Sequence, residues 1–376
     1  MHRADDPRIF ERECRSLTDH GYDVSYLCPG APAEERRDGV LLLSLPARPR
    51  AQRLLSWPDI VRAVRRLAPA VIHLHDPELL ALAPLLGVLG ARVIYDMHEY
   101  VAQSVRAKYY IPEALRPFAA RASGAAERLL AARVDGAAAV VSRQFDALGA
   151  RPAQRVLLPN YPRFSRFAAP HPVAEIAADP RLKLVHIGTL SRERGVSMMI
   201  EVMRVAGEGC VLYLGGAFPD PAYEAEVRAE LAGALGPRVR LLGRIAPARL
   251  PDYLAAADVV WIAGTGTAQY VLPANSTKLY EGMASGLAVL TSDLPGRAEV
   301  VRDVGCGLAV PTSVAGHAAG VLELLDHREL LKEFGARARQ AVRERLSWEA
   351  IEGDLLEFYE RMLAADGHGG GAPPAA

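Results

Sequence analysis

The sequence predicts an α/β fold made of two Rossmann-like domains. Short apolar runs alternate with helical patterns along nearly the whole chain, which is typical of parallel sheets covered by helices. The length of 376 residues is too great for one ordinary core and suits two domains of roughly 150–200 residues each. Between the two alternating regions, residues 160–180 hold four prolines and no periodic pattern, which predicts an interdomain linker.

The first domain is predicted over residues 1–159, where apolar runs bounded by turn residues alternate with helical periodicity. Strands are expected at 23–28, 40–45, 70–75, 92–96, 137–141 and 155–158. Helices are expected at 8–20, 52–67, 78–89, 112–133 and 143–149. Strands joined by helices in this way form a parallel, Rossmann-like sheet.

The second domain is predicted over residues 181–347, where the same alternation restarts after the linker. Its strands are expected at 183–187, 210–214, 239–242, 259–263 and 288–292. Its helices are expected at 196–205, 222–235, 248–257 and 278–285, and helical sequence then fills 314–325, 328–345 and 348–363. Residues 366–376 are a Gly, Pro and Ala tail, which we expect to be disordered.

Composition and charge narrow the classes of protein. Lys plus Arg and Asp plus Glu both number 44, so the net charge gives no argument for nucleic acid, and we expect no nucleic-acid partner. The four cysteines are scattered, which favours reduced thiols in a cytosolic protein. A charged segment follows Met1, and no run of about 18 apolar residues occurs. We expect a cytoplasmic protein with neither a standard secretion signal nor a membrane span.

The most informative motif begins at Asn275, Ser276 and Thr277, all of which suit a helix N-cap. Backbone N–H groups at such a helix start are able to hold an anion. Lys278 and Glu281 follow and, being three residues apart, share one face of the helix. A cation for phosphate beside a carboxylate for sugar hydroxyls is what a nucleotide-sugar site needs. An ordinary capped helix that packs on a strand is the alternative for this motif alone.

This segment resembles the donor-binding motif of the family 4 glycosyltransferases of the GT-B fold, and the resemblance extends over most of the chain. It implies two domains that face across a cleft and a final helix, here 348–365, that crosses back to the first domain. By this resemblance Glu281 holds the ribose and Lys278 lies near the diphosphate. The implied reaction moves a sugar from a UDP- or GDP-linked donor to a glycan or lipid-linked acceptor hydroxyl, with retention, no other cofactor and no metal.

A second motif runs from a predicted strand, through a turn that includes Gly188, into a helix. Backbone amides and the helix dipole favour phosphate at such strand ends. The family commonly has an arginine after this glycine and a lysine before the next one, whereas this chain has Thr189 and Arg194. Arg194 is able to replace the lysine, and Arg192 is a further candidate for phosphate contact. A solvated, charged surface turn is the alternative.

Two more positions are compared with the family. Gly243 to Pro247 resembles the loop that seats the nucleobase, with Ile245 as the expected contact, although a simple strand-to-helix turn also fits. The family often places an acidic residue eight positions before the helix glutamate, where this chain has Pro273. We therefore assign no catalytic pair of glutamates.

Polar clusters follow two predicted strands of the first domain, at the edge where ligands of such sheets bind. His75 and Asp76 follow one strand, and His98 and Glu99 follow the next. His98 resembles the histidine that reaches the donor sugar in related enzymes, and we assign it the catalytic role. The alternatives are a structural histidine and, for Asp76, the start of a helix. No His-x-x-x-His or carboxylate pair has metal-ligand spacing, and we expect no metal.

Residues 2–13 resemble the family segment that normally follows the first strand and its glycine-rich turn, yet neither precedes it here. Either the true start lies upstream or the protein lacks its first strand. Four arginines surround an apolar stripe in 112–133, which predicts either peripheral contact with the inner face of the plasma membrane or a solvated surface. A role in cell-envelope polysaccharide synthesis is expected. The competing functions are a nucleotide-sugar 2-epimerase-like isomerase and a non-catalytic nucleotide-sugar-binding homologue.

Overall fold

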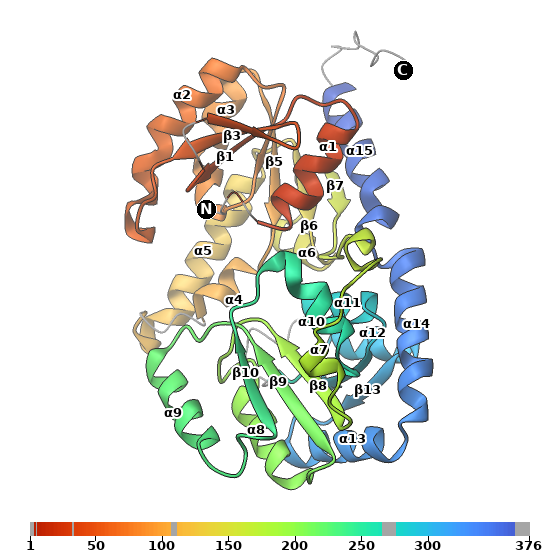
Figure 1. Ribbon diagram of the computed structural model, residues 1–376. Helices are drawn as coiled ribbons and strands as arrows, with labels where there is room; N and C mark the ends of the chain where they lie inside the picture. The colour runs from red at the N-terminus through yellow and green to blue at the C-terminus, as the bar shows by residue number, and fades with distance from the viewer. Residues whose placement is uncertain (1–3, 5, 32–33, 107–110, 265–275, 365–376) are drawn as a thin grey trace. The chain divides into compact units, whose positions relative to one another are not determined.

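The computed structural model describes residues 4, 6–31, 34–106, 111–264 and 276–364 (Figure 1). Contacts divide the chain into two compact units, which are described separately here. Unit 1 comprises Met1–Pro159 and Ile351–Ala376, and unit 2 comprises Asn160–Ala350. No helix of the described residues is long and apolar enough to cross a membrane. The tail at 366–376, Pro273 and Asn275 lie outside the described residues.

Unit 1 contains two sheets. Strands β1 (Ser25–Pro29), β3 (Val40–Leu45) and β2 (Glu34–Arg37) form one in the order β1-β3-β2. The parallel strands β4 (Val71–Leu74), β5 (Arg92–Met97), β6 (Gly136–Ala139) and β7 (Gln154–Leu157) form the other. No described strand precedes the first helix, and β1 and β4 each pair with a single described neighbour. The expected single sheet is therefore divided within the described residues.

The helices of unit 1 are shorter than the predicted ones because several are split. They are η1 (Ile9–Cys14), α1 (Arg15–Asp19), η2 (Arg50–Ser56), α2 (Trp57–Leu67), η3 (Pro77–Leu82), α3 (Ala83–Val88), α4 (Val101–Arg106), η4 (Glu113–Leu115), α5 (Arg116–Ala131) and α6 (Gln144–Leu148). Pro58, Pro84 and Pro117 stand in the first turn of α2, α3 and α5. A proline has no N–H to donate, so it is tolerated at a helix start and interrupts a longer helix.

In the described part of unit 2, six parallel strands form one sheet (Figure 1). In spatial order these are β10 (Val239–Gly243), β9 (Cys210–Gly215), β8 (Leu182–Ile187), β11 (Val259–Ile262), β12 (Ala288–Ser292) and β13 (Gly307–Val310). The helices are η5 (Phe164–Phe167), α7 (Ala174–Ala177), α8 (Val196–Val205), α9 (Pro221–Leu231), η6 (Pro247–Arg249), α10 (Leu250–Ala255), α11 (Thr277–Ala284), α12 (Arg297–Val304), α13 (Val314–Asp326) and α14 (Glu329–Arg345).

Two hydrophobic cores cover the two faces of this sheet. Leu184 and Trp261 pack with α8 and α13, whereas their neighbours Val185 and Val260 pack with α11 and α14. Strands buried on both faces are typical of a parallel sheet between helices. Residues 160–180 belong to unit 2 rather than forming an open linker, because their apolar side chains, such as Phe167, are buried in the second core.

The last helix, α15 (Trp348–Ala364), begins in unit 2 and has most of its length in unit 1. Trp348 is fully buried, and its backbone N–H donates to the carbonyl oxygen of Pro162 at 2.8 Å. Farther along, Phe358 packs directly on Gly136 of β6, where an added Cβ would lie 2.7 Å from Phe358 Cζ. The helix is therefore anchored by aromatic side chains near its start and in its second half.

Candidate functional site

Two glycines follow the carboxyl ends of β8 and β9 in unit 2, and other atoms approach them closely. These two strand ends are called the glycine floor below. Gly188 follows β8 with φ +149°, and an ideal Cβ there would lie 2.1 Å from Lys278 Cε. Gly216 follows β9, and a Cβ there would lie 1.7 Å from the carbonyl oxygen of Gly188. At Gly216 the neighbouring atom belongs to the backbone and cannot give way, whereas a Cβ at Gly188 would displace the end of the Lys278 side chain. Both glycines also have a positive φ, which other residues rarely adopt. The structure thus brings together Gly188 and Lys278, which are 90 residues apart in the sequence.

Lys278 stands in the first turn of α11, which begins after the N-cap Ser276. Ser276 has an extended backbone but makes no side-chain capping hydrogen bond, and Thr277 opens the helix itself. Backbone N–H groups in the first turn of a helix favour an anion, and the helix dipole acts in the same sense. The predicted helix start is confirmed, whereas the predicted side-chain cap is not formed at Ser276.

Two arginines act on the charge of Lys278 at this helix start. Burial and then the charge of Arg194 lower the pKa of Lys278 to about 8; Glu281 opposes this, and Arg297 adds to it. Burial, followed by the charge of Lys278, also lowers the pKa of His186 to about 3, so this imidazole is neutral at pH 7. Positive charge at a helix start favours a bound anion there.

Arg297 was not predicted from the sequence. It is the first residue of α12, which follows the loop 293–296 after β12, and only 4% of it is exposed. Its Nη1 lies against Gly264 at the end of β11, 2.7 Å from the position of an ideal Cβ. The one signal for it in the sequence is an arginine placed just beyond the carboxyl end of a strand.

A buried hydrogen-bond network fixes the backbone beside Arg297. Trp261 Nε1 donates to His317 Nδ1 at 3.0 Å, so His317 carries its proton on Nε2, which lies 2.9 Å from Ser292 Oγ. Ser292 Oγ in turn donates to the carbonyl oxygen of Gly264 and accepts from its N–H, at 3.0 and 3.1 Å. Burial lowers the pKa of His317 to about 4, which keeps it neutral. The network holds the ends of β11 and β12 in register.

Ile245 lies over the end of β9, close to the glycine floor. Its Cδ1 would be 2.6 Å from a Cβ at Gly215, and Ile187 Cγ1 would be 3.2 Å from the same point. An apolar surface therefore adjoins the positively charged helix start, which is the arrangement that a base and its diphosphate require.

Arg192 has partners away from this helix start. Its guanidinium pairs with Glu226 of α9 and lies over the ring of Tyr223, 4.3 Å from the ring centroid. More than half of the side chain is exposed. We therefore leave Arg192 out of the phosphate contacts proposed below.

A separate buried cluster in unit 1 surrounds the predicted His98. His98 Nε2 lies 2.7 Å from Asp96 Oδ2, and His75 Nδ1 lies 3.3 Å from both of these atoms. Arg8 binds Asp96 with two nitrogens, Nε at 3.0 Å and Nη2 at 2.9 Å. Burial would raise the pKa of Asp96, but Arg8 and the two histidines hold it well below its usual value. An ionised Asp96 thus accepts a hydrogen bond from His98 Nε2–H.

Glu13 and His73 complete this cluster. The Glu13 carboxylate is buried 3.2 Å from Arg8 Nε, and burial together with the Asp96 charge raises its pKa well above the usual value. His73 Nδ1 bonds the Tyr359 hydroxyl of α15 at 3.0 Å. Sequence reasoning missed Arg8, Glu13 and Asp96, because the ion pair of Arg8 with Asp96 joins residues 88 apart.

Four members of the cluster could hold a metal ion. Ligand atoms of Glu13, His73, His75 and Asp96 all lie within 4.8 Å of one another. Arg8 already supplies a positive charge to both carboxylates, at 3.2 Å from Glu13 and 2.9 Å from Asp96. A divalent cation would repel this guanidinium, so the donor set does not favour a metal, and its absence stays a prediction.

Asp76 and Glu99 take local roles. Asp76 is the N-cap of η3, which supports the helix-start interpretation. Glu99 is exposed and accepts a hydrogen bond from the Ser104 hydroxyl. Of the four residues expected at these strand ends, His75 and His98 contact each other, with His75 Nδ1 3.3 Å from His98 Nε2. They belong to unit 1, and the Lys278 group belongs to unit 2.

Two protein-family descriptions match the chain. "Glycosyl transferase 4-like domain" matches residues 8–161, and "Glycosyl transferases group 1" matches residues 181–327. Together they cover most of the sequence, one for each Rossmann-like half.

Individual relatives agree with these matches. A phosphatidyl-myo-inositol mannosyltransferase of Mycolicibacterium smegmatis is 25% identical over 371 residues, 93% of this chain and 88% of that protein. Sucrose-phosphate synthase of Thermosynechococcus elongatus has a TM-score of 0.76 at 20% identity, over 95% and 93% of the two chains. HepE of Anabaena, solved in complex with UDP-glucose, has a TM-score of 0.69 at 15% identity, over 86% and 87%. The two solved structures establish the likeness of fold.

Proposed function

We propose that this chain transfers a sugar from a nucleoside-diphosphate donor, because it belongs to the group 1 glycosyltransferases, with a glycosyltransferase 4-like first domain and a GT-B fold. The acceptor is a hydroxyl of a glycan or a lipid-linked glycan, and the anomeric configuration is retained. The chain is a glycosyltransferase enzyme; its donor, acceptor and stereochemistry are our proposal.

One observation carries the donor site. Arg194 and Arg297 act on Lys278 in the first turn of α11, where the pKa of Lys278 is lowered to about 8 by burial and by these neighbouring positive charges. A bound diphosphate would relieve this repulsion, and its oxygens would accept hydrogen bonds from backbone N–H groups. When the sugar leaves, negative charge develops on the same phosphates, so the cations already in place stabilise the transition state.

The other donor contacts follow from the surroundings of this helix. Glu281 stands one turn after Lys278 and is assigned to the ribose hydroxyls. Ile245 over the end of β9 is assigned to the nucleobase. His98 is assigned to the donor sugar, with its ring oriented by Asp96 at 2.7 Å. Each assignment keeps the role that the family resemblance gave to that position.

Relatives guide the choice of substrates. One named relative is a phosphatidyl-myo-inositol mannosyltransferase, and HepE was solved with UDP and with UDP-glucose. We therefore propose a UDP- or GDP-linked sugar as donor and a lipid-linked acceptor in cell-envelope synthesis. Such a reaction would place the protein in the cytoplasm, in peripheral contact with the membrane.

The test is a transfer assay with purified protein. UDP- and GDP-linked hexoses are incubated with and without a lipid extract, and both released nucleoside diphosphate and glycosylated product are measured. We expect product only with lipid, an α-linkage from an α-donor, and a loss of about 100-fold in Lys278→Ala. Lys332→Ala, at an exposed position of α14, is the matched control. Conversion of the donor sugar without acceptor would instead indicate an epimerase, and binding without any turnover would indicate a non-catalytic homologue.

A further inference from the structure

A chain of buried hydrogen bonds runs through a hydrophobic core of unit 2 and ends beside Arg297. It is formed by Trp261 of β11, His317 of α13, Ser292 of β12 and Gly264 after β11, and all four residues are buried. These four residues are called the polar relay below. The relay begins at a well-held side chain, because Trp261 packs with α8 and α13 in the core and its backbone carbonyl accepts from His186 Nδ1 at 2.9 Å.

Every hydrogen bond of the polar relay has a fixed direction. An indole N–H only donates, so Trp261 leaves His317 with Nδ1 as the acceptor and Nε2–H as a donor. Nε2–H then donates to Ser292 Oγ at 2.9 Å. The Ser292 hydroxyl has its hydrogen left for the Gly264 carbonyl oxygen, 3.0 Å away, and a lone pair for the Gly264 N–H, 3.1 Å away. The relay therefore specifies one arrangement of the Gly264 backbone.

Packing alone does not account for such a relay. Replacing both partners of a buried hydrogen bond with apolar groups of the same shape is often nearly neutral for stability. A fully satisfied polar network, in contrast, specifies a single geometry for the groups that it joins. His317 adds no ion pair either, because burial lowers its pKa to about 4 and the imidazole is neutral at pH 7. What the relay supplies is a defined position for Gly264.

The Arg297 guanidinium lies directly on Gly264. An ideal Cβ at Gly264 would be 2.7 Å from Arg297 Nη1 and 3.4 Å from both Cζ and Nη2. Only 4% of Arg297 is exposed, and its charge acts on Lys278 in the first turn of α11. Protein interiors are closely packed, so a shift of Gly264 moves a guanidinium that rests on it. That guanidinium is one of the positive charges assigned above to the diphosphate.

We propose that His317 is a positioning residue of the donor site, which acts through Ser292 and Gly264 to fix the place of the Arg297 guanidinium against the donor diphosphate. This proposal deepens the proposed function and rests on it, because it requires a diphosphate beside Lys278 and Arg297. His317 is fully buried and acts from the core, so it needs no contact with the ligand.

A double-mutant cycle on nucleotide binding tests the proposal. UDP and GDP are each titrated by calorimetry into the wild-type chain, His317→Leu, Arg297→Ala and the double variant. We expect His317→Leu to weaken binding about tenfold and Arg297→Ala about 10- to 100-fold. Adding His317→Leu to Arg297→Ala should change the dissociation constant by about twofold at most, because the side chain that the relay positions is then absent.

Matched variants separate positioning from stability. His317→Gln keeps an N–H for Ser292 and should bind nucleotide within about threefold of the wild-type chain. Val321→Ala, one turn farther along α13 and fully buried, should lower Tm and leave nucleotide binding unchanged. Ser292→Ala removes a single oxygen atom from the relay, so it should reproduce the loss of binding even where His317→Leu does not fold.

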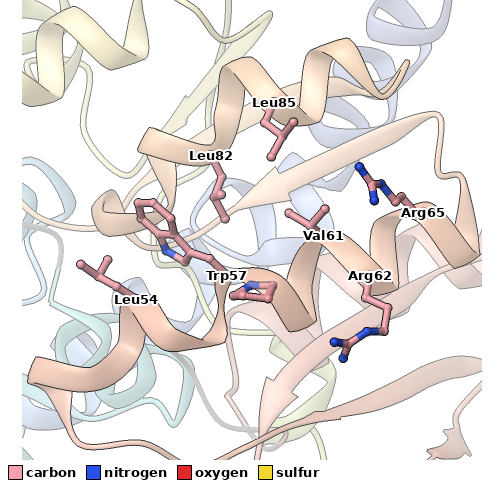
Figure 2. A pocket seen from close by; sticks show the side chains of 8 residues that line it. Leu54, Trp57, Val61, Arg62, Arg65, Leu82 and Leu85 are labelled. Atoms are coloured by element: carbon pink, nitrogen blue, oxygen red, sulfur yellow. The ribbon is translucent and has the colours of Figure 1, made fainter.

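The indole N–H of Trp261 gives a second readout, by NMR. The chain has three tryptophans, and Figure 2 shows Trp57 in unit 1, among apolar side chains that line a groove beside α2. Trp57→Phe leaves the indole signals of Trp261 and Trp348. The Trp261 signal is the one that moves in His317→Leu, where its acceptor is lost. We expect bound nucleotide to shift this signal in Trp57→Phe, and not after Arg297→Ala is added, at equal saturation.

The proposal is overturned if His317→Leu weakens binding equally with and without Arg297, or if Val321→Ala weakens it as much. It is also overturned if bound nucleotide leaves the Trp261 signal in place. Lys278→Ala, titrated in parallel, reports separately on the proposed function. Weak binding by Lys278→Ala together with wild-type binding by His317→Leu would overturn the positioning role alone, whereas a wild-type chain that binds neither nucleotide would overturn the donor site as well.

Discussion

Raising the pH should weaken nucleoside-diphosphate binding through Lys278. Burial and then Arg194 lower the pKa of its ammonium group to about 8 in the free protein. A diphosphate beside it favours the charged form, so the pKa rises on binding and the protein takes up a proton. The affinity is therefore greatest well below pH 8 and decreases as the pH rises through 8 and above.

The magnitude follows from the fraction of Lys278 that is charged. With a pKa of about 8, roughly 90% of the free protein is protonated at pH 7 and roughly 10% at pH 9. The dissociation constant should therefore increase about tenfold over this range, which corresponds to about 1.4 kcal/mol. At pH 8 binding should take up about half a proton.

Isothermal titration in two buffers with different ionisation enthalpies measures this proton uptake. Lys278→Arg is the control, since its guanidinium stays charged and should bind without proton uptake at pH 8. Lys278→Ala should bind weakly at every pH. The reasoning is refuted if the wild-type protein takes up no proton at pH 8, or if Lys278→Ala keeps the same dependence on pH.

Three further predictions follow from single contacts. Gly188→Ala should weaken nucleoside-diphosphate binding at least tenfold, because its Cβ would displace Lys278 Cε; Gly207→Ala, where φ is also positive but no atom lies within 4 Å, should leave binding unchanged in the same titration. Ile245→Ala should weaken binding of the nucleoside diphosphate by about tenfold and not that of inorganic diphosphate, since the lost contact is to the base; equal losses for both ligands would contradict this. Glu127→Gln should stabilise unit 1 at pH 8 by about 2–3 kcal/mol and have little effect at pH 5, as measured by urea unfolding. Burial raises the pKa of Glu127 to about 7, so the wild-type protein loses free energy of unfolding as the pH rises from about 4.5 to 7. Gln carries no charge and still accepts a hydrogen bond from the Tyr95 hydroxyl. A change of equal size at both pH values would argue against this cause.

The fold was largely predictable because most strands are apolar runs bounded by turn residues. Strand β2 was missed because its sequence is Glu-Glu-Arg-Arg, and it is held by antiparallel pairing with β3 rather than by apolar side chains. Helix α12 and strand β13 were also missed, because they are short and lack a strong periodic pattern. Proline positions shortened several predicted helices.

The donor site was predictable only where its residues are close in sequence. Ser276, Thr277, Lys278 and Glu281 share one helix start, and this part of the motif could be recognised directly. Arg297 depends on where β12 ends relative to α11, which no local pattern specifies.

The cluster of unit 1 shows the same limit. His75 and His98 could be placed at neighbouring strand ends, since β4 and β5 pair in parallel. Arg8 and Glu13 come from a helix near the start of the chain, and only the tertiary fold brings them to Asp96. Arg192 was expected at the phosphates because of its position in the turn, but Glu226 and Tyr223 of α9 engage it.

Thermal unfolding with UDP, GDP and ADP tests the central claim, that unit 2 holds a nucleoside diphosphate at the start of α11. A ligand that binds the folded state raises Tm, by an amount that grows with its concentration above Kd. We predict a rise with one of the three nucleotides that is lost in both Lys278→Ala and Glu281→Ala and kept in Lys332→Ala. No rise with any nucleotide, or a rise that both site variants retain, would contradict the account.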